Sequence, residues 1–184
     1  MILLRHGQSE FNLAFTATRV DPGIKDPKLT PLGHEQAEQA AEALAGQGLR
    51  RIIVSPYTRA LQTAAPLARR LRVPVMVHPL VRERCALSCD VGSPRTVLAA
   101  QWPDLDFHHI DEVWWPALHE TAAQTEARAA LFRAEMAAVD EWRDTVVVSH
   151  WGFILCMTGT SMTNGAWLRC DPFAAAPTDI VWRP

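Results

Sequence analysis

The sequence predicts an α/β fold, in which a mainly parallel central sheet lies between layers of helices on both faces, as a three-layer sandwich. Short apolar runs without polar alternation, typical of strands buried on both faces, alternate along the chain with longer segments of helical periodicity. Alternation of strands with helices favours parallel pairing. The length of 184 residues is about that of one domain, so residues 1–184 are expected to form a single domain.

The first half of the chain supplies three of the expected strands. Residues 1–4 form an apolar run with Arg5 at its carboxyl end. Thr30 precedes a run of alanines and leucines at helical spacing and is expected to cap that helix, which two glycines end. The elements expected next are a strand over 51–54, a helix over 60–71 and a strand over 73–77.

The second half begins with a segment that is harder to interpret. Residues 82–118 hold scattered prolines and glycines and a short possible helix over 95–101, so they are interpreted as an inserted cap or a long connection. Elements expected after this segment are a helix over 120–142, a β-branched strand over 145–149, a helix over 153–158 and an edge strand over 179–182.

Composition excludes several classes of protein. With 48% apolar and 21% charged residues, the chain falls near globular averages, which excludes disordered and collagen-like classes. The net charge of −2 gives no global positive field, so neither nucleic acid nor an anionic membrane is an expected partner. No apolar run approaches the roughly 20 residues of a membrane helix. The N-terminal run reaches Arg5 and His6 without room for a secretory signal, and a cytoplasmic location is therefore expected.

The cysteines and most histidines give no metal-site pattern. The four cysteines contain no CxxC pair and are expected to be free and mostly buried. His108 and His109 stand near Asp106 and Asp111, but adjacent residues on a strand point apart, so no metal site is expected. All seven tryptophans follow residue 100, and they either wall a pocket or fill the core.

Three segments that follow expected strands carry residues suited to phosphate chemistry. Arg5 and His6 follow the first strand, Arg59 the second, and His150 the run over 145–149. Ligands of such sheets bind outside the carboxyl ends of the strands, where these side chains would meet. Two guanidinium groups suit a phosphate, because each presents a planar fork of donors that stays charged. A neutral histidine between them could attack phosphorus.

Four segments in register resemble the histidine phosphatase superfamily, in its phosphoglycerate-mutase-like branch. They are Leu4-Arg5-His6-Gly7-Gln8-Ser9-Glu10-Phe11-Asn12, Leu29-Thr30-Pro31-Leu32-Gly33-His34-Glu35-Gln36-Ala37, Ser55-Pro56-Tyr57-Thr58-Arg59-Ala60-Leu61-Gln62-Thr63-Ala64 and Val147-Val148-Ser149-His150. The resemblance is strongest over 1–64 and 144–158. It implies that His6 is the nucleophile that becomes phosphohistidine, that Arg5 and Arg59 clamp the phosphate, and that His150 is the second histidine holding the transferring oxygens. As an imidazolium, His150 would add a positive donor.

Further residues are assigned to the substrate side of the site. The resemblance implies a phosphate contact at Asn12, with Ser9 as a weaker candidate. Gly7 is expected to let the backbone turn closely beside the anion. Trp151 is a departure, since many relatives carry glycine after the second histidine, and it is expected to narrow the rim of the pocket.

A leaving alkoxide needs a proton, so a carboxylic acid of raised pKa is expected near the phosphate. Glu83 is the first choice, because it follows Leu80-Val81-Arg82 and the family places its acid after a similar leucine and basic residue. The family's glycine and glutamate-glycine pattern downstream is replaced here by 84–90, which makes Asp90 a rival.

The expected function is a metal-independent phosphomonoester hydrolase that forms phosphohistidine on His6, with no cofactor and with a small phosphorylated substrate as its partner. Cofactor-dependent phosphoglycerate mutation is the first alternative, although such mutases are longer. A non-catalytic module that binds a phosphorylated ligand is the second, and a metallophosphatase, opposed by the lack of paired carboxylates near His6, is the third. The sequence names neither the leaving group nor the oligomeric state.

Overall fold

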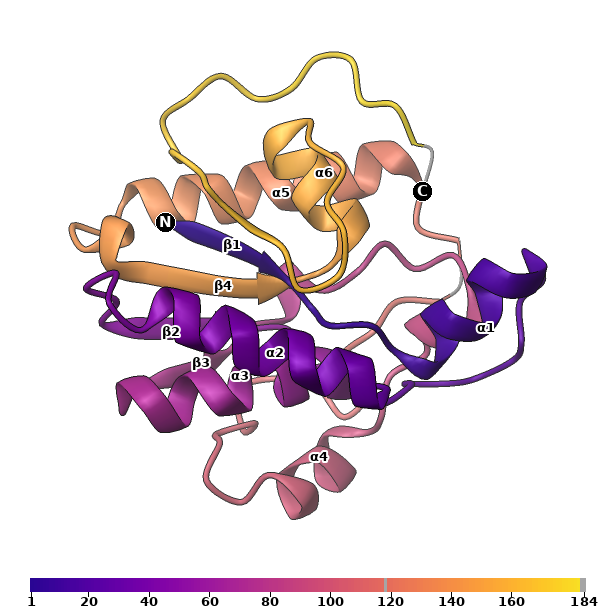
Figure 1. Cartoon of the computed structure of the whole chain (residues 1–184). Helices are drawn as coiled ribbons and strands as arrows, with labels where there is room; N and C mark the ends of the chain where they lie inside the picture. The colour runs from indigo at the N-terminus through magenta and orange to yellow at the C-terminus, as the bar shows by residue number, and fades with distance from the viewer. Residues whose placement is uncertain (118, 183–184) are drawn as a thin grey trace.

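The central sheet has five strands in the order β3-β2-β4-β1-β5 within the residues described by the computed structural model, which are 1–117 and 119–182 (Figure 1). The first four in chain order pair in parallel, whereas β5 is antiparallel to β1. The strands are β1 (Ile2–Arg5), β2 (Arg51–Val54), β3 (Val75–Val77), β4 (Thr145–Ser149) and β5 (Trp167–Arg169).

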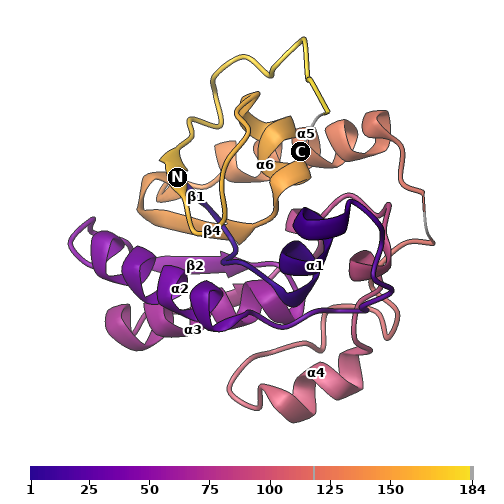
Figure 2. The same cartoon turned by 45° about the vertical axis from the view of Figure 1, so that its right-hand side comes forward.

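Helices cover both faces of this sheet, which confirms the expected α/β three-layer architecture. In Figure 1, α2 and α3 lie on one side of the strands, and α5 and α6 lie on the other. Figure 2 shows α1 standing beside the carboxyl end of β1 and α4 below α3. The helices are α1 (Glu10–Thr18), α2 (Pro31–Leu44), α3 (Thr58–Leu71), α4 (Arg95–Gln101), α5 (Ala122–Ala137) and α6 (Trp151–Thr158), with short 3₁₀ turns at Pro79–Val81, Ser88–Asp90 and Trp142–Asp144.

Two hydrophobic cores form because successive strand residues point to opposite faces. In β1, Ile2 and Leu4 join the core under α2 and α3, while Leu3 joins the core under α5 and α6. Both faces of the central strands are therefore buried, which explains why their sequences show no polar alternation.

Two expectations about the elements need correction, and one helix was missed. The edge strand is β5 and not 179–182, because Ile180 and Trp182 pack against the core of α5 and α6 instead of pairing with the sheet. The helix expected over 120–142 begins only at Ala122, where the side chain of Thr121 caps it, and ends at Ala137. Helix α1 was not expected, and its N-terminal cap comes from Ser9.

Residues 82–118 contain few regular elements. Only a 3₁₀ turn and α4 occur in the described part of this segment, which excludes residue 118. Buried side chains of the segment, Leu98, Phe107, Ile110 and Trp114, belong to the core of α2 and α3. The interpretation of 82–118 as a cap stays a prediction, and so does the single domain over 1–184. Residues 183–184 also lie outside the described part of the chain.

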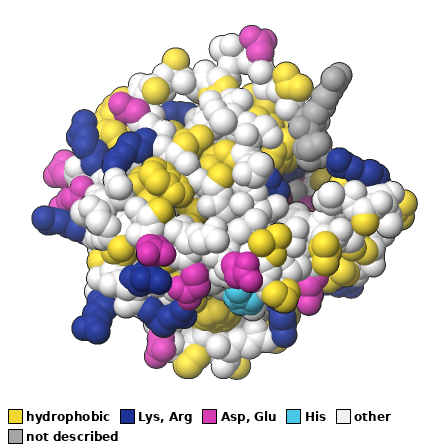
Figure 3. Space-filling view, viewed as in Figure 1, with side chains coloured by type: hydrophobic (Ala, Val, Ile, Leu, Met, Phe, Trp, Pro, Cys, Tyr) yellow, Lys and Arg dark blue, Asp and Glu magenta, His cyan; other side chains and the backbone are white. Residues whose placement is uncertain are grey.

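The surface carries charges of both signs. In Figure 3, Lys and Arg side chains are interspersed with Asp and Glu on the face shown. None of the helices in the described ranges combines the length and apolar character needed to cross a lipid bilayer. All four cysteines are buried and free, as predicted.

Candidate active site

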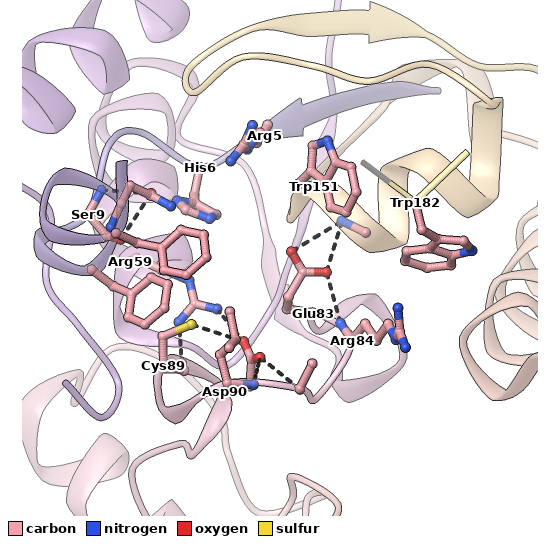
Figure 4. Close-up of a pocket in the computed structure, with 16 residues that line it drawn as sticks. Arg5, His6, Ser9, Arg59, Glu83, Arg84, Cys89, Asp90, Trp151 and Trp182 are labelled. Atoms are coloured by element: carbon pink, nitrogen blue, oxygen red, sulfur yellow. Dashed lines mark hydrogen bonds and ion pairs between the residues drawn. The ribbon is translucent and has the colours of Figure 1, made fainter. Parts of the chain in front are cut away.

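A cavity of about 250 Å³ opens where β1 ends and α6 begins, at the carboxyl edge of the parallel strands (Figure 4). Segments far apart in sequence meet there: the end of β1 with α1, the start of α3, residues 83–90, the start of α6 and the C-terminal segment. The lining residues are Arg5, His6, Ser9, Phe11, Asn12, Phe15, Arg59, Glu83, Arg84, Ala86, Leu87, Cys89, Asp90, Trp151, Gly152 and Trp182.

His6 is buried at the end of β1, with its ring nitrogens in distinct roles. Its Nδ1 lies 2.7 Å from the carbonyl oxygen of Gly7. Because a carbonyl only accepts, Nδ1 carries the proton and Nε2 keeps its lone pair. Burial first, and then the charges of Arg59 and Arg5, hold the pKa of His6 well below 6.5. The ring is therefore neutral at neutral pH, with the lone pair of Nε2 unprotonated.

Arg5 and Arg59 bring two guanidinium groups to the same cavity (Figure 4). Arg59 donates to the carbonyl of Cys89 at 2.8 Å and to Oδ1 of Asp90 at 3.3 Å, and it lies over the ring of Tyr57. Arg5 donates to the carbonyl of Met162, while its buried Nε has no hydrogen-bond partner among the described residues. Both arginines keep N–H groups that a bound anion could engage.

His150 is fully buried behind His6 and does not line the cavity itself. The two rings lie 5.0 Å apart between centroids. Its Nε2 is 2.7 Å from the hydroxyl of Ser55, and its buried Nδ1 has no partner within the described residues. Burial and then the charge of Arg59 hold its pKa well below 6.5, so the free site contains a neutral imidazole and not the expected imidazolium.

Glu83 lies at the N-terminus of α6. Its Oε1 accepts from the backbone N–H groups of Gly152 at 2.9 Å and Arg84 at 2.8 Å (Figure 4). Among the described residues, its Oε2 accepts only from Gly152, at 3.2 Å. Burial, and then the charge of Asp90, raise its pKa above the ordinary 4.5 although these bonds oppose the shift. Such a carboxyl can carry a proton at a higher pH than an exposed one.

Asp90 differs from Glu83 in its partners. The buried carboxylate pairs with Arg59 and accepts from the backbone N–H groups of Ala86 and Leu87, both at 3.0 Å. Burial raises its pKa as well, against the charge of Arg59. The thiol of Cys89 also donates to its Oδ1, at 3.5 Å. With its oxygens committed to four partners, Asp90 is suited to hold Arg59 and the 86–90 turn in place.

Asn12 lines the cavity. Its Oδ1 accepts from the N–H and the hydroxyl of Ser9 and from Nδ2 of Asn164, at 3.0, 3.0 and 3.2 Å, which leaves Nδ2 as the remaining polar group. Asn164 also donates to the carbonyl of His6 at 3.1 Å. Sequence reasoning missed Asn164, since nothing in the 160–166 loop marks it.

Gly7 does not line the cavity. A side chain there would place Cβ 2.3 Å from the carbonyl oxygen of Gly33, and its N–H donates to the hydroxyl of Thr63. The structure thus gives this glycine a packing reason, the close approach of two backbone segments. A substrate contact at Gly7 stays a prediction.

The tryptophans divide between the two roles. Trp151 and Trp182 line the cavity, whereas Trp114 and Trp115 pack on the core of α2 and α3. Trp182 was missed as a site residue, because its place depends on how the C-terminal segment returns across α6.

No group of three or more His, Cys, Asp or Glu side chains that could hold a metal ion occurs within the described residues. His109 instead lies 2.6 Å from the carbonyl of Val77, and Asp106 accepts from the backbone N–H of His108.

Comparison with known proteins identifies the class of this site. The sequence profile of the histidine phosphatase superfamily (branch 1) matches residues 1–180. The chain therefore belongs to that superfamily, as its motifs predict.

Relatives within the superfamily point to phosphatases. A glucosyl-3-phosphoglycerate phosphatase of Mycolicibacterium vanbaalenii is 30% identical over 217 aligned positions, which cover all of this chain and 91% of that protein. The native structure of a mycobacterial glucosyl-3-phosphoglycerate phosphatase matches with a TM-score of 0.62 and 26% identity, over 91% of this chain and 87% of that one. A probable phosphoglycerate mutase of Proteus mirabilis is 40% identical, but over only 44% of this chain and 36% of its own length. These comparisons support the expected enzyme class, a phosphoric monoester hydrolase.

Proposed function

We propose that this chain hydrolyses small phosphomonoesters by transferring the phosphoryl group first to His6 and then to water. The observation that best supports this proposal is the placement of His6. Its neutral ring exposes the lone pair of Nε2 to a cavity that also contains two arginines and a carboxyl of raised pKa.

In the first step, Nε2 of His6 attacks phosphorus and the bond from phosphorus to the ester oxygen breaks. Arg5 and Arg59 bind the equatorial oxygens, whose charge they stabilise in the transition state. Asn12, which also lines the cavity, supplies Nδ2 as a further donor. Glu83 donates its proton from Oε2 to the leaving oxygen, so that an alcohol departs and a carboxylate remains.

In the second step, the Glu83 carboxylate takes a proton from water while the water oxygen attacks the phosphorus of phosphohistidine. The bond to Nε2 breaks, inorganic phosphate forms, and Glu83 is again protonated. His150 remains behind His6 throughout, with 5.0 Å between the ring centroids. Negative charge on the phosphoryl group at His6 would raise the pKa of His150, so the imidazolium expected from the sequence belongs to the bound state in this proposal.

The ion pair of Arg59 with Asp90 fits the same scheme. A guanidinium that already has a carboxylate partner remains fixed when the substrate leaves, which avoids a reorganisation cost at each turnover. We therefore assign Asp90 to positioning Arg59, and Glu83 to proton transfer.

Mutase activity is the competing function. A mutase must retain its phosphoenzyme against water, and known mutases carry additional segments around the site. The phosphatase of Mycolicibacterium vanbaalenii aligns over all of this chain, whereas the probable mutase of Proteus mirabilis aligns over only 44% of it, which favours hydrolysis. A cytoplasmic location, and the absence of nucleic acid and membrane partners, stay predictions.

The proposal is tested by a turnover screen against phosphomonoesters without added metal. The quantity measured is the release of inorganic phosphate. We expect hydrolysis by the native protein and by the exposed-histidine control His34→Ala, and none by His6→Ala. A second assay supplies 3-phosphoglycerate with its bisphosphate primer. Isomerisation to 2-phosphoglycerate faster than phosphate release would replace the hydrolase by a mutase. Loss of all turnover with a chelator, restored by metal, would instead favour a metallophosphatase.

A further inference from the structure

The part of the cavity beyond the phosphate-binding groups is bounded mainly by aromatic and aliphatic side chains. Four aromatic residues contribute to it, two from α1 and two from the α6 side. Trp151 and Trp182 lie across the cavity from Arg59 and Cys89 (Figure 4). The leaving group of a substrate whose phosphate lies at His6 has to occupy this space.

Phe11 and Phe15 form one aromatic pair. They are one helical turn apart on α1, and their rings stack at 5.4 Å and 15°. Phe11 is buried and Phe15 is half-buried, so the pair offers an apolar surface that is anchored in the fold.

Trp151 and Trp182 form the other pair, with ring centroids 6.0 Å apart and an angle of 74°. Both indoles are held in place. The Nε1 of Trp151 donates to the hydroxyl of Ser161 at 2.9 Å, and the guanidinium of Arg84 lies 4.7 Å from the ring of Trp182. Arg84 is itself fixed by a bond from its Nε to the carbonyl of Glu120. Ordered rings lose little conformational entropy when a ligand packs on them.

Few polar groups accompany these rings, apart from the guanidinium of Arg84 beside Trp182. The Oδ1 of Asn12, the hydroxyl of Ser9 and the Nε1 of Trp151 are already hydrogen-bonded to protein groups. A polyol or sugar leaving group would lose water from several hydroxyls and find few replacements, which is unfavourable. An aromatic ring loses no such hydrogen bonds and can pack on the aromatic faces and edges.

We propose that the site prefers phosphomonoesters whose leaving alcohol carries an aromatic ring, packed against Trp151 and Trp182. The inference rests on the proposed hydrolase, and it adds the substrate class. The cavity of about 250 Å³ has room for a small ring system beside the phosphate. Trp182 is then a specificity-determining residue supplied by the C-terminal segment.

The kinetic test compares benzyl phosphate with glycerol 3-phosphate and glucose 6-phosphate, which all release alcohols and not activated phenols. We expect kcat/KM to be at least about tenfold higher for benzyl phosphate. Trp182→Ala should lower kcat/KM for benzyl phosphate about tenfold, mainly through KM, and leave glycerol 3-phosphate nearly unchanged. Trp182→Phe should restore most of the loss. The exposed neighbour supplies the control Val181→Ala, which should change neither substrate.

Binding gives a second readout that needs no catalysis. Benzylphosphonate should bind to the native protein at least about tenfold more tightly than methylphosphonate, and Trp182→Ala should remove that difference. Preferential turnover of glucose 6-phosphate or glycerol 3-phosphate, or equal losses for all esters on Trp182→Ala, would overturn the inference and leave the hydrolase intact. Selective phosphonate binding without turnover of any ester would support the inference while rejecting the hydrolase.

Discussion

The substitution Glu83→Gln isolates the proton on which the first step depends. The Oε1 of Glu83 accepts from both Gly152 and Arg84 at under 3 Å, whereas Oε2 accepts from Gly152 at 3.2 Å. A glutamine oxygen can take the place of Oε1 and keep both short bonds, so the fold and the N-terminus of α6 should remain intact. What is lost is the acidic proton, together with the 3.2 Å bond from Gly152, which the amide nitrogen in place of Oε2 cannot accept.

General acid catalysis contributes about 10²–10⁴ in rate, so kcat for an alkyl phosphate should fall by that factor, equivalent to about 2.7–5.4 kcal/mol in the activation barrier. A nitrophenyl ester has a leaving group that needs little protonation, and its rate of enzyme phosphorylation should fall far less. The raised pKa also sets the sign of the pH dependence: the native rate of phosphorylation should fall as pH rises through the pKa of Glu83. Glu83→Gln should lose that limb.

The assay is rapid-quench measurement of phosphoenzyme formation with alkyl and nitrophenyl esters, over a range of pH. Glu35→Gln, at an exposed position on α2, serves as the matched control and should behave as the native protein. Equal losses for both esters in Glu83→Gln would refute its role as the acid. A selective loss for the alkyl ester in Asp90→Asn instead would transfer that role to Asp90.

Three further predictions concern stability, each measured by urea unfolding. Because the pKa of His150 is lowered in the folded state, the unfolded chain is protonated at His150 before the folded chain is when the pH falls. The contribution of His150 to the free energy of unfolding is therefore present above about pH 6.5. It decreases below that pH by about 1.4 kcal/mol per pH unit. His150→Gln should have a slope shallower by that amount, and an unchanged slope would contradict the lowered pKa. Asp90→Ala leaves Arg59 as a buried unpaired charge and should cost about 3–5 kcal/mol, whereas a loss below about 1 kcal/mol would show that the pair is solvated. Gly33→Ala would place Cβ 2.0 Å from a backbone oxygen and should cost at least about 1–3 kcal/mol, while Gly46→Ala, which meets no atom within 4 Å, should be nearly neutral; equal effects would remove the packing explanation.

Strand periodicity predicts most of this fold because the central strands are buried on both faces. The apolar, β-branched run of β4 favours a buried strand, and the alanine spacing of α2 favours a helix. Both elements are present in the structure. The C-terminal segment is different. Apolar residues at 180–182 have the pattern of an edge strand, but a few residues of that kind pack equally well on a helix, and local pattern does not decide between the two.

The convergence of Arg5, His6 and Arg59 on one cavity follows from the rule that parallel strands end at the same edge. That rule places strand ends, and it says nothing of irregular segments. The contact of Asn164 with Asn12, and the return of Trp182 to the cavity, depend on loops whose course no periodicity encodes. The protonation state of His150 could not be predicted from the sequence either, because its lowered pKa comes from its complete burial.

The central claim is that His6 becomes covalently phosphorylated during turnover. Rapid quenching with a phosphomonoester, followed by peptide mapping, tests it directly. We predict one phosphoryl group on His6, acid-labile and base-stable, which forms at least as fast as kcat, is present in His34→Ala and is absent from His6→Ala. Turnover without any such intermediate, or with the phosphoryl group on another residue, would contradict the account.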